Sequence, residues 1–210
     1  MTLLNIHPRD PEPLKLARVV NCLREGGIII YPTDTIYSFG CDIHNSRAIE
    51  KLARMKGTRV DKARFSIICH DLADVAAYSR QLENHVFKMM KSLLPGPYTF
   101  ILDAGKNIPK IFSERKKTIG VRVPDHEVPL RLVRLLGNPI VSTSVHDEDE
   151  MLEYTSEPEL MFERYKNDVD LVIDSGPSGL EASSVILCSG GKIEWVRQGK
   201  GAEQAAPWIQ

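Results

Sequence analysis

The chain has 210 residues, of which 42% are hydrophobic and 26% are charged, and both values are ordinary for a soluble globular protein. Its formal net charge of −1 indicates no general preference for nucleic acid or for membrane surfaces. The 4 cysteines form no CxxC pair, which argues against a zinc knuckle or a thioredoxin-like redox centre. No apolar run approaches the roughly 20 residues of a membrane span. The amino terminus has no long apolar segment either, so we expect a cytoplasmic protein.

The first element expected along the chain is a helix. Asp10 followed by Pro11 is typical of a helix N-cap and its first helical position. Leu16, Val20 and Leu23 then recur at helical spacing. Gly26 is expected just beyond the end of this helix, because glycine readily adopts the left-handed conformation found there.

The segment that follows this helix is the first candidate for a ligand site. The apolar run Ile28–Ile30 predicts a buried strand that stops at Tyr31-Pro32. Thr33, Asp34 and Thr35 come next, so hydroxyl groups and a carboxylate stand at the carboxyl end of a strand, where open α/β sheets bind ligands. The alternative is a capped loop, because Thr and Asp often close turns.

The middle of the chain alternates helices and strands. The expected elements are a helix capped by Asn45 or Ser46, a strand over Phe65–Cys69, a helix capped by Asp71, a helix whose core stripe is Val86, Phe87, Met90 and Leu94 and which ends at Pro95-Gly96-Pro97, and strands over Tyr98–Leu102 and Thr118–Val123.

The last third of the chain continues in the same way. It contains a helix stopped by Gly137, a short strand Ile140–Val141 that leads into a Ser142–Ser144 loop, a helix over Glu157–Tyr165 opened by a capping box of Ser156 and Glu159, a strand over Asp170–Asp174, and a hairpin of Ser184–Cys188 and Ile193–Arg197 about Gly190-Gly191. Helices, strands and hairpins in this order predict a single α/β domain over 1–210 with a mixed sheet.

Charge is distributed unevenly along this near-neutral chain. Arg54–Arg64 holds 5 basic residues against one acid, and Lys106–Arg122 holds 6 against one. Asp147–Glu159 carries 7 acidic residues and no Lys or Arg. Two basic segments are consistent with a local anion site, although charged runs are more often solvated faces.

The familiar catalytic motifs are absent from the sequence. It has no GxxxxGK[ST], GxGxxG, HExxH or GxSxG, which argues against P-loop proteins, dinucleotide folds and common hydrolases. An enzyme of this kind is expected to position reactants and neutralise charge rather than to form covalent intermediates. Three polar groups suit that task if they converge on one crevice: Thr33–Thr35, the basic set Lys56, Arg59 and Lys62, and Ser142–Ser144.

Several motifs, in one order over Leu14–Gly201, carry a resemblance to a known family. They are Tyr31–Tyr37 with Gly40, the basic segment Lys56–Lys62, Pro95–Thr99, Gly120–Pro124, Ser142–Ser144, Ser183–Ile186 and Val196–Gly199. The chain resembles the YrdC/YciO family, whose best-known members are threonylcarbamoyl-AMP synthases, and Arg115–Pro124 is most similar to the YciO branch. The resemblance implies a twisted mixed α/β sheet with helices and a concave, positively charged cavity.

The resemblance also implies an activity and a set of residues. Synthases of this family combine ATP, L-threonine and bicarbonate into threonylcarbamoyl-adenylate, release pyrophosphate, and feed the t6A modification of tRNA; Mg²⁺ would screen the triphosphate. By this resemblance Thr33, Tyr37, Arg122 and Ser184 would bind threonine, and Lys56, Arg59, Ser142, Ser144, His146 and Arg197 would bind ATP. No catalytic residue and no metal ligand is assigned.

The chain departs from the synthase pattern in two places. Lys56 and Arg59 are separated by two residues instead of one, and Val145-His146 stand where the synthases have Ala-Asn. We therefore expect a synthase-like nucleotidyltransferase of weak or altered activity. The alternative is a non-catalytic paralogue that binds double-stranded RNA or ribosomes, with tRNA or rRNA as its partner.

Overall fold

The structure, a computed structural model, describes residues 1–113, 117–145 and 156–209. In this part of the chain one sheet has the strand order β1-β8-β2-β3-β7-β4-β6-β5-β9-β10. The strands are β1 (Thr2–Asn5), β2 (Ile29–Tyr31), β3 (Ser38–Asp42), β4 (Ser66–Ile68), β5 (Tyr98–Asp103), β6 (Thr118–Arg122), β7 (Ile140–Ser144), β8 (Leu171–Asp174), β9 (Ser184–Ser189) and β10 (Lys192–Arg197).

Parallel and antiparallel neighbours are both present, so the prediction of a mixed sheet is confirmed. β8 runs parallel to β1 and β2, and β4 runs parallel to β6. β3 runs antiparallel to both β2 and β7. Because β2 and β7 therefore point the same way, Tyr31 and Ser144 both lie opposite Ser38 at one edge of the sheet.

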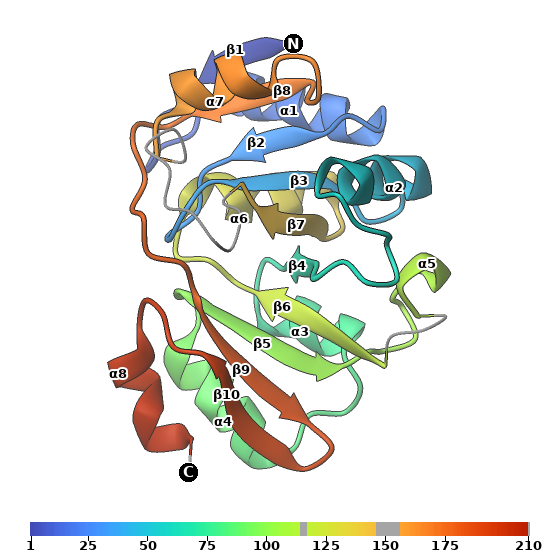
Figure 1. The fold of residues 1–210 in the computed structure, drawn as a ribbon. Helices are drawn as coiled ribbons and strands as arrows, with labels where there is room; N and C mark the ends of the chain where they lie inside the picture. The colour runs from blue at the N-terminus through green and yellow to red at the C-terminus, as the bar shows by residue number, and fades with distance from the viewer. Residues whose placement is uncertain (114–116, 146–155, 210) are drawn as a thin grey trace.

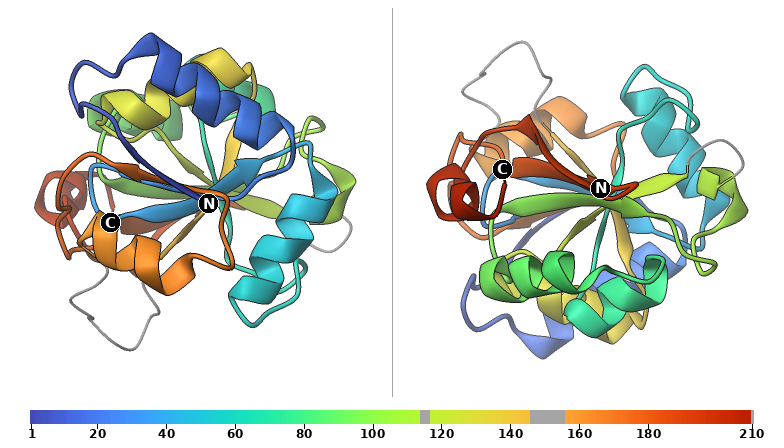
Figure 2. Two further views of the ribbon diagram at one scale, coloured as in Figure 1. Left: turned by 90° about the horizontal axis from the view of Figure 1, so that it is seen from above. Right: turned by 90° about the horizontal axis from the view of Figure 1, so that it is seen from below.

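Helices cover the two faces of this sheet unequally. They are α1 (Pro13–Arg24), α2 (Ser46–Met55), α3 (Leu72–Tyr78), α4 (Asn84–Leu93), α5 (Lys110–Ser113), α6 (Glu127–Leu136), α7 (Pro158–Tyr165) and α8 (Ala202–Ala205), with a 3₁₀ turn at Ala206–Trp208. Figure 1 shows the twisted sheet, and Figure 2 shows α1, α3, α4 and α6 together on one face. α2 and α7 lie toward opposite sides of the other face.

The buried strands supply side chains to two apolar clusters. In β2 and the residue before it, Ile28 and Ile30 belong to one cluster, and Ile29 and Tyr31 belong to the other. This alternation follows from the two-residue period of a strand. It explains why the sequence there reads as a continuous apolar run rather than as alternating apolar and polar residues.

Local signals in the sequence placed many of these elements correctly. The Asn45 side chain accepts a hydrogen bond from the Ala48 amide, and Asp71 caps α3 through two amides. Gly26 and Gly137 have φ values of 86° and 83° at the ends of α1 and α6. Gly190 and Gly191, with φ values of 63° and 76°, form the turn between β9 and β10, where two successive positive φ values are required.

The predicted N-cap residues of two helices were wrong, although the second helix begins within one residue of its predicted start. α1 begins at Pro13, with Glu12 rather than Asp10 as its N-cap, because Pro13 satisfies the same first-position preference as Pro11. α7 begins at Pro158 after Glu157, which makes no side-chain cap. The Ser156 hydroxyl lies 3.5 Å from the Glu157 carboxylate.

Two other predictions about the placement of residues were also wrong. Phe87, expected in the core, is 41% exposed, whereas Met89 and Leu93 are buried on α4. Ser142–Ser144, expected as a loop, lie within β7, because this strand continues to Ser144 opposite Ser38 of β3.

Candidate functional site

The turn between β2 and β3 is held in shape by its own hydroxyl groups. Thr33 Oγ1 donates to the Ile36 carbonyl at 2.7 Å and accepts from the Thr35 amide at 3.1 Å. Thr33 Oγ1 and Thr35 Oγ1 are 3.0 Å apart, and both residues are buried. Buried polar groups need partners, and here the turn supplies them internally. Asp34 lies between these two threonines.

An ion pair joins this turn to the end of β6. Arg122 Nη2 donates to Asp34 Oδ1 at 2.9 Å and to Thr35 Oγ1 at 3.1 Å. The other carboxylate oxygen, Asp34 Oδ2, accepts from the Asp125 amide at 3.1 Å. The side chains of Arg122 and Asp34 are 7% and 8% exposed. The pair is therefore largely removed from solvent, where charge-assisted hydrogen bonds are strong.

One donor of Arg122 has no partner in the described part of the chain. Its Nε is buried and has no hydrogen-bond partner among the residues that the structure describes. A buried guanidinium N–H without a partner is uncommon and requires an explanation. A guanidinium group is planar and binds oxyanions through adjacent N–H groups, which makes Arg122 a candidate anion-binding group.

The carboxyl-terminal segment contacts the same turn. Lys200 Nζ donates to the Asp34 carbonyl at 2.6 Å, and the backbone of Lys200 forms a bridge with Ser183. The Ser184 hydroxyl donates to the Gly199 carbonyl at 2.9 Å and accepts from its amide at 3.0 Å. A Cβ on Gly199 would lie 2.4 Å from the Ala182 carbonyl, so this close approach requires glycine.

Arg197 lies next to this contact, at the end of β10. Its Nε and Nη2 donate to the Ser183 carbonyl at 3.1 Å and 2.9 Å. Lys200 therefore links three of the predicted residues. It reaches Arg122 through Asp34. Its backbone pairs with Ser183, which is next to Ser184 and accepts hydrogen bonds from Arg197. The sequence prediction missed Lys200, although its place one residue beyond the Val196–Gly199 motif was a signal that could have found it.

Tyr37 and Ser142 are predicted site residues whose hydroxyl groups are committed elsewhere in the fold. The Tyr37 hydroxyl donates to the Gly176 carbonyl at 2.8 Å and accepts from the Ser175 amide at 3.1 Å. The Tyr31 hydroxyl and Ser142 Oγ are 2.6 Å apart in the buried interior. Burial raises the pKa of both tyrosines above the ordinary value, so both phenols remain neutral hydrogen-bonding groups.

Lys56 and Arg59 come from a different part of the fold. They lie in the segment between α2 and β4, which Figure 1 shows across the molecule from the turn between β2 and β3. Arg59 is 72% exposed at its side chain, and its Nε contacts Asp61 at 3.1 Å. This segment packs against α5 through an edge-to-face contact of Phe65 and Phe112, whose ring centroids are 6.3 Å apart.

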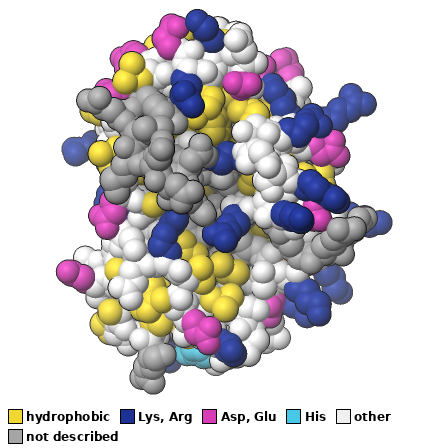
Figure 3. Space-filling view, in the orientation of Figure 1, with side chains coloured by type: hydrophobic (Ala, Val, Ile, Leu, Met, Phe, Trp, Pro, Cys, Tyr) yellow, Lys and Arg dark blue, Asp and Glu magenta, His cyan; other side chains and the backbone are white. Residues whose placement is uncertain are grey.

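That contact places the two basic segments of the sequence beside each other. Figure 3 shows Lys and Arg side chains gathered along the right-hand side of the face that carries α2 and α7. The exposed members, called the basic surface below, are Arg54, Arg59, Lys62, Arg64, Lys106, Lys110 and Lys117.

Some predictions about the site are left as predictions. Ser144 is the last residue of β7 and is half-buried. His146 lies outside the described residues, as do Arg115 and the acidic run 147–150. A groove of about 440 Å³ opens between α1 and the start of β8, and it is lined by none of the predicted site residues. The concave basic cavity therefore stays a prediction.

One titratable group close to this site is unusual. Burial lowers the pKa of His126 from the ordinary 6.5, while the nearby carboxylates of Asp34 and Asp125 act in the opposite direction. His126 is the N-cap of α6, and its Nδ1 accepts from the Val128 amide at 3.2 Å. Only a neutral imidazole can accept in this way, so the cap and the low pKa agree.

The described residues form neither a metal cluster nor a membrane span. Within 1–113, 117–145 and 156–209, no three His, Cys, Asp or Glu side chains stand together so that they could hold a metal ion. Over the same residues, no helix has the length and apolar character needed to cross a membrane.

Known proteins are similar to this chain over nearly its whole length. The family model Sua5_yciO_yrdC, described as telomere recombination, matches residues 21–199. YciO of Escherichia coli (strain K12) is 37% identical over 201 residues, covering 93% of this chain and 94% of that protein. A threonylcarbamoyl-AMP synthase of Halorhodospira halophila is 30% identical over 143 residues, covering 68% of this chain and 74% of the synthase.

Two solved structures share the fold. The crystal structure of E. coli YciO has a TM-score of 0.89 at 35% identity, covering 97% of this chain and 98% of that one. P. abyssi Sua5 complexed with L-threonine has a TM-score of 0.87 at 22% identity, covering 100% of this chain and 62% of that one. These likenesses confirm the predicted single α/β domain with a mixed sheet.

Proposed function

Because the chain belongs to the Sua5/YciO/YrdC family, we propose that it binds L-threonine and ATP and forms threonylcarbamoyl-adenylate. The observation that carries this proposal is the nearly buried Arg122, which is fixed by Asp34 and Thr35 and whose buried Nε has no partner in the described part of the chain. Such a group is suited to the carboxylate of an amino acid. The threonine named in the Sua5 complex and the synthase relatives support this choice of substrate.

The proposed reaction has two bond-forming steps. The amino nitrogen of threonine attacks the carbon of bicarbonate, water leaves, and an N-carboxylate forms. An oxygen of that carboxylate then attacks the α-phosphorus of ATP, the bond between the α-phosphorus and the bridging oxygen breaks, and pyrophosphate leaves. Neither step needs a covalent bond to the protein, which agrees with the lack of a nucleophile motif in the sequence.

The protein would contribute chiefly by positioning substrates and stabilising charge. On the threonine side we assign Arg122 to the carboxylate, while Thr33, Tyr37 and Ser184 hold the surrounding backbone in place through their hydroxyl groups. On the ATP side, Arg197, Lys56 and Arg59 would stabilise the negative charge that develops on the phosphates. Ser142, Ser144 and His146 complete this assignment, which rests on the resemblance.

Mg²⁺ is implied only by the resemblance. In sites of this kind it is usually held by one or two carboxylates together with the phosphates of the substrate. We propose that it enters with ATP as part of the substrate, and no step is assigned to it.

A second function is favoured by the basic surface. Its seven exposed Lys and Arg side chains come from two segments that pack together through Phe65 and Phe112. Such a surface is suited to a phosphate backbone, so the alternative of an RNA-binding paralogue predicts binding that weakens steeply with salt. Titration of double-stranded RNA at two salt concentrations tests it, and no affinity at low salt would remove it.

The synthase proposal is tested by omitting one substrate at a time. Pyrophosphate release is measured with ATP, L-threonine, bicarbonate and Mg²⁺ together, and then with each of the first three left out. The proposal predicts release that needs all three. The Arg122→Met variant should lose it, whereas the Arg131→Met variant, altered at an exposed arginine of α6, should keep it. Release that does not depend on threonine would mean another substrate.

A further inference from the structure

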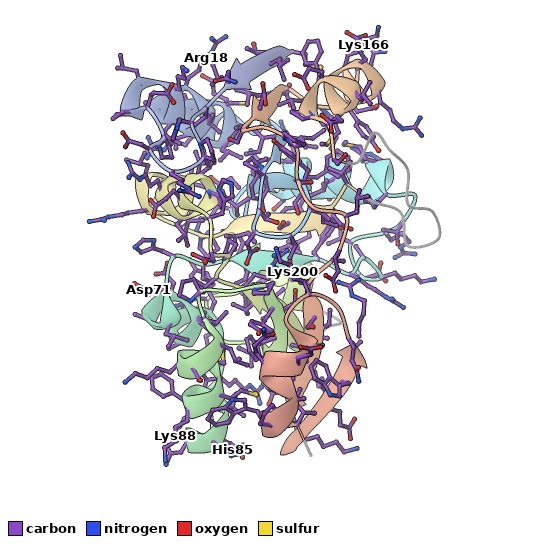
Figure 4. The ribbon with its side chains drawn as sticks, turned by 90° about the vertical axis from the view of Figure 1, so that its left-hand side faces the viewer. Arg18, Asp71, His85, Lys88, Lys166 and Lys200 are labelled. Atoms are coloured by element: carbon purple, nitrogen blue, oxygen red, sulfur yellow. The ribbon has the colours of Figure 1, made fainter. Side chains whose placement is uncertain are left out.

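We propose that Lys200 is a positioning residue for the amino-acid side of the site, an inference that rests on the proposed function. Lys200 follows β10 and is 166 residues from Asp34 in sequence, yet its ammonium group donates to the Asp34 carbonyl at 2.6 Å. Figure 4 shows Lys200 at mid-height in the molecule, away from either end.

Asp34 is held from three separate parts of the chain. Its carbonyl accepts from Lys200, its Oδ1 accepts from Arg122, and its Oδ2 accepts from the Asp125 amide. The turn itself contributes the bond between the Thr33 hydroxyl and the Thr35 amide. Arg122 and Asp125 bind the side chain of Asp34, whereas Lys200 binds its backbone carbonyl from outside the turn.

The position of Lys200 is itself well fixed. Its amide donates to the Ala182 carbonyl at 2.9 Å, and its carbonyl accepts from the Ser184 amide at 3.4 Å. The Gly199 that precedes it is locked to the Ser184 hydroxyl by two hydrogen bonds. The side chain therefore extends from an anchored backbone to the Asp34 carbonyl and connects the end of β10 with the turn.

The link from Lys200 to Asp34 affects the orientation of Arg122. Because the Asp34 carboxylate and the Thr35 hydroxyl both bind Arg122 Nη2, any rotation of the turn carries the guanidinium group with it. Lys200 thus helps to hold the Arg122 guanidinium group in its orientation through Asp34. A one-ångström displacement of a binding group can cost much of its contribution, so the loss of Lys200 should weaken amino-acid binding.

The first test separates positioning from general stability. In the Lys200→Met variant we expect the KM for L-threonine to rise about five- to tenfold, in line with the loss of one solvent-exposed hydrogen bond of ordinary net strength. The KM for ATP and the melting temperature should change little. Lys200→Arg keeps a charged donor and should recover most of the threonine KM. Lys192→Met, at an exposed lysine of β10 paired with Glu194, is the matched control and should behave as wild type.

The outcomes distinguish this inference from the proposed function. A wild-type protein that makes no product refutes the synthase proposal. A wild type that turns over while Lys200→Met keeps the wild-type threonine KM, or while both KM values rise equally, overturns the role given to Lys200.

A second measurement does not depend on turnover. Hydrogen exchange of the backbone amides in residues 33–37 should be faster in Lys200→Met than in wild type and in Lys192→Met. Unchanged exchange in this turn would overturn the inference whatever the activity of the protein.

Discussion

The buried pair of Arg122 and Asp34 allows a quantitative prediction for the Asp34→Asn variant. This change keeps an oxygen that can accept from Arg122 Nη2 but removes the negative charge. It also places an amide nitrogen where one carboxylate oxygen stands, so the Asp125 amide, which donates at 3.1 Å, would lose its acceptor or face another donor. The guanidinium group would remain nearly buried without a countercharge.

The structure gives the size of the effect. At the observed separation of 2.9 Å, an effective dielectric constant of roughly 20 implies an attraction of about 6 kcal/mol. Part of this is offset because both charges have been removed from water, and breaking one side of a buried pair costs about 3–5 kcal/mol. Since asparagine retains one hydrogen bond, we expect Asp34→Asn to lower the free energy of unfolding by about 3 kcal/mol. For a domain of this size, that corresponds to a fall in Tm of roughly 6–12 °C.

Equilibrium unfolding in urea is the assay, with an exposed pair as the control. Arg131 and Glu127 on α6 lie 2.9 Å apart, and their side chains are 41% and 49% exposed. Glu127→Gln should therefore cost less than about 1 kcal/mol. If Asp34→Asn is destabilised no more than Glu127→Gln, the Arg122–Asp34 pair contributes as little as a surface ion pair and the reasoning is refuted.

Three further predictions concern other parts of the fold. Gly40→Ala should cost about 1–3 kcal/mol, because its Cβ would lie 2.7 Å from a Tyr31 ring carbon; urea unfolding measures this, and a neutral result contradicts it. Burial lowers the pKa of His126 below 6.5, so stability should be full above that pH and fall as the pH drops beneath it, because the unfolded chain then binds more protons; His126→Asn, which can still cap α6, should lose this part of the pH dependence. Burial raises the pKa of the Cys22 thiol to about 11, so thiol reagents at pH 8 should label native Cys22 far more slowly than free cysteine; equal rates would contradict the assignment.

Short-range chemistry explains what the sequence predicted well. Asn45 and Asp71 cap helices through amides two or three residues away, and the Gly190-Gly191 turn depends only on its own backbone conformation. Pro11 and Pro13 both satisfy the local rule for the first position of a helix, so the sequence alone does not choose between them, and α1 begins at Pro13. The exposure of Phe87 likewise depends on which side of α4 meets the sheet, a choice that the apolar stripe alone does not determine.

Long-range contacts explain what the sequence could not predict at the site. The bond from Arg122 to Asp34 spans 88 residues and that from Lys200 to Asp34 spans 166. The sequence indicated Thr33 and Arg122 separately, but only the fold shows that Asp34 joins them. The Tyr37 hydroxyl binds the carbonyl of Gly176, which is distant in sequence. The Ser184 hydroxyl binds the carbonyl of Gly199, on the far side of the β9–β10 hairpin.

The measurement that tests the central claim most directly is detection of the product itself. Purified protein is incubated with ATP, L-threonine, ¹³C-bicarbonate and Mg²⁺, and the quenched mixture is analysed by mass spectrometry beside a threonylcarbamoyl-AMP synthase as positive control. We predict threonylcarbamoyl-adenylate that carries the ¹³C label, together with pyrophosphate, and its loss in Arg122→Met. No labelled adenylate at high protein concentration, while the control synthase produces it, would contradict the proposed function.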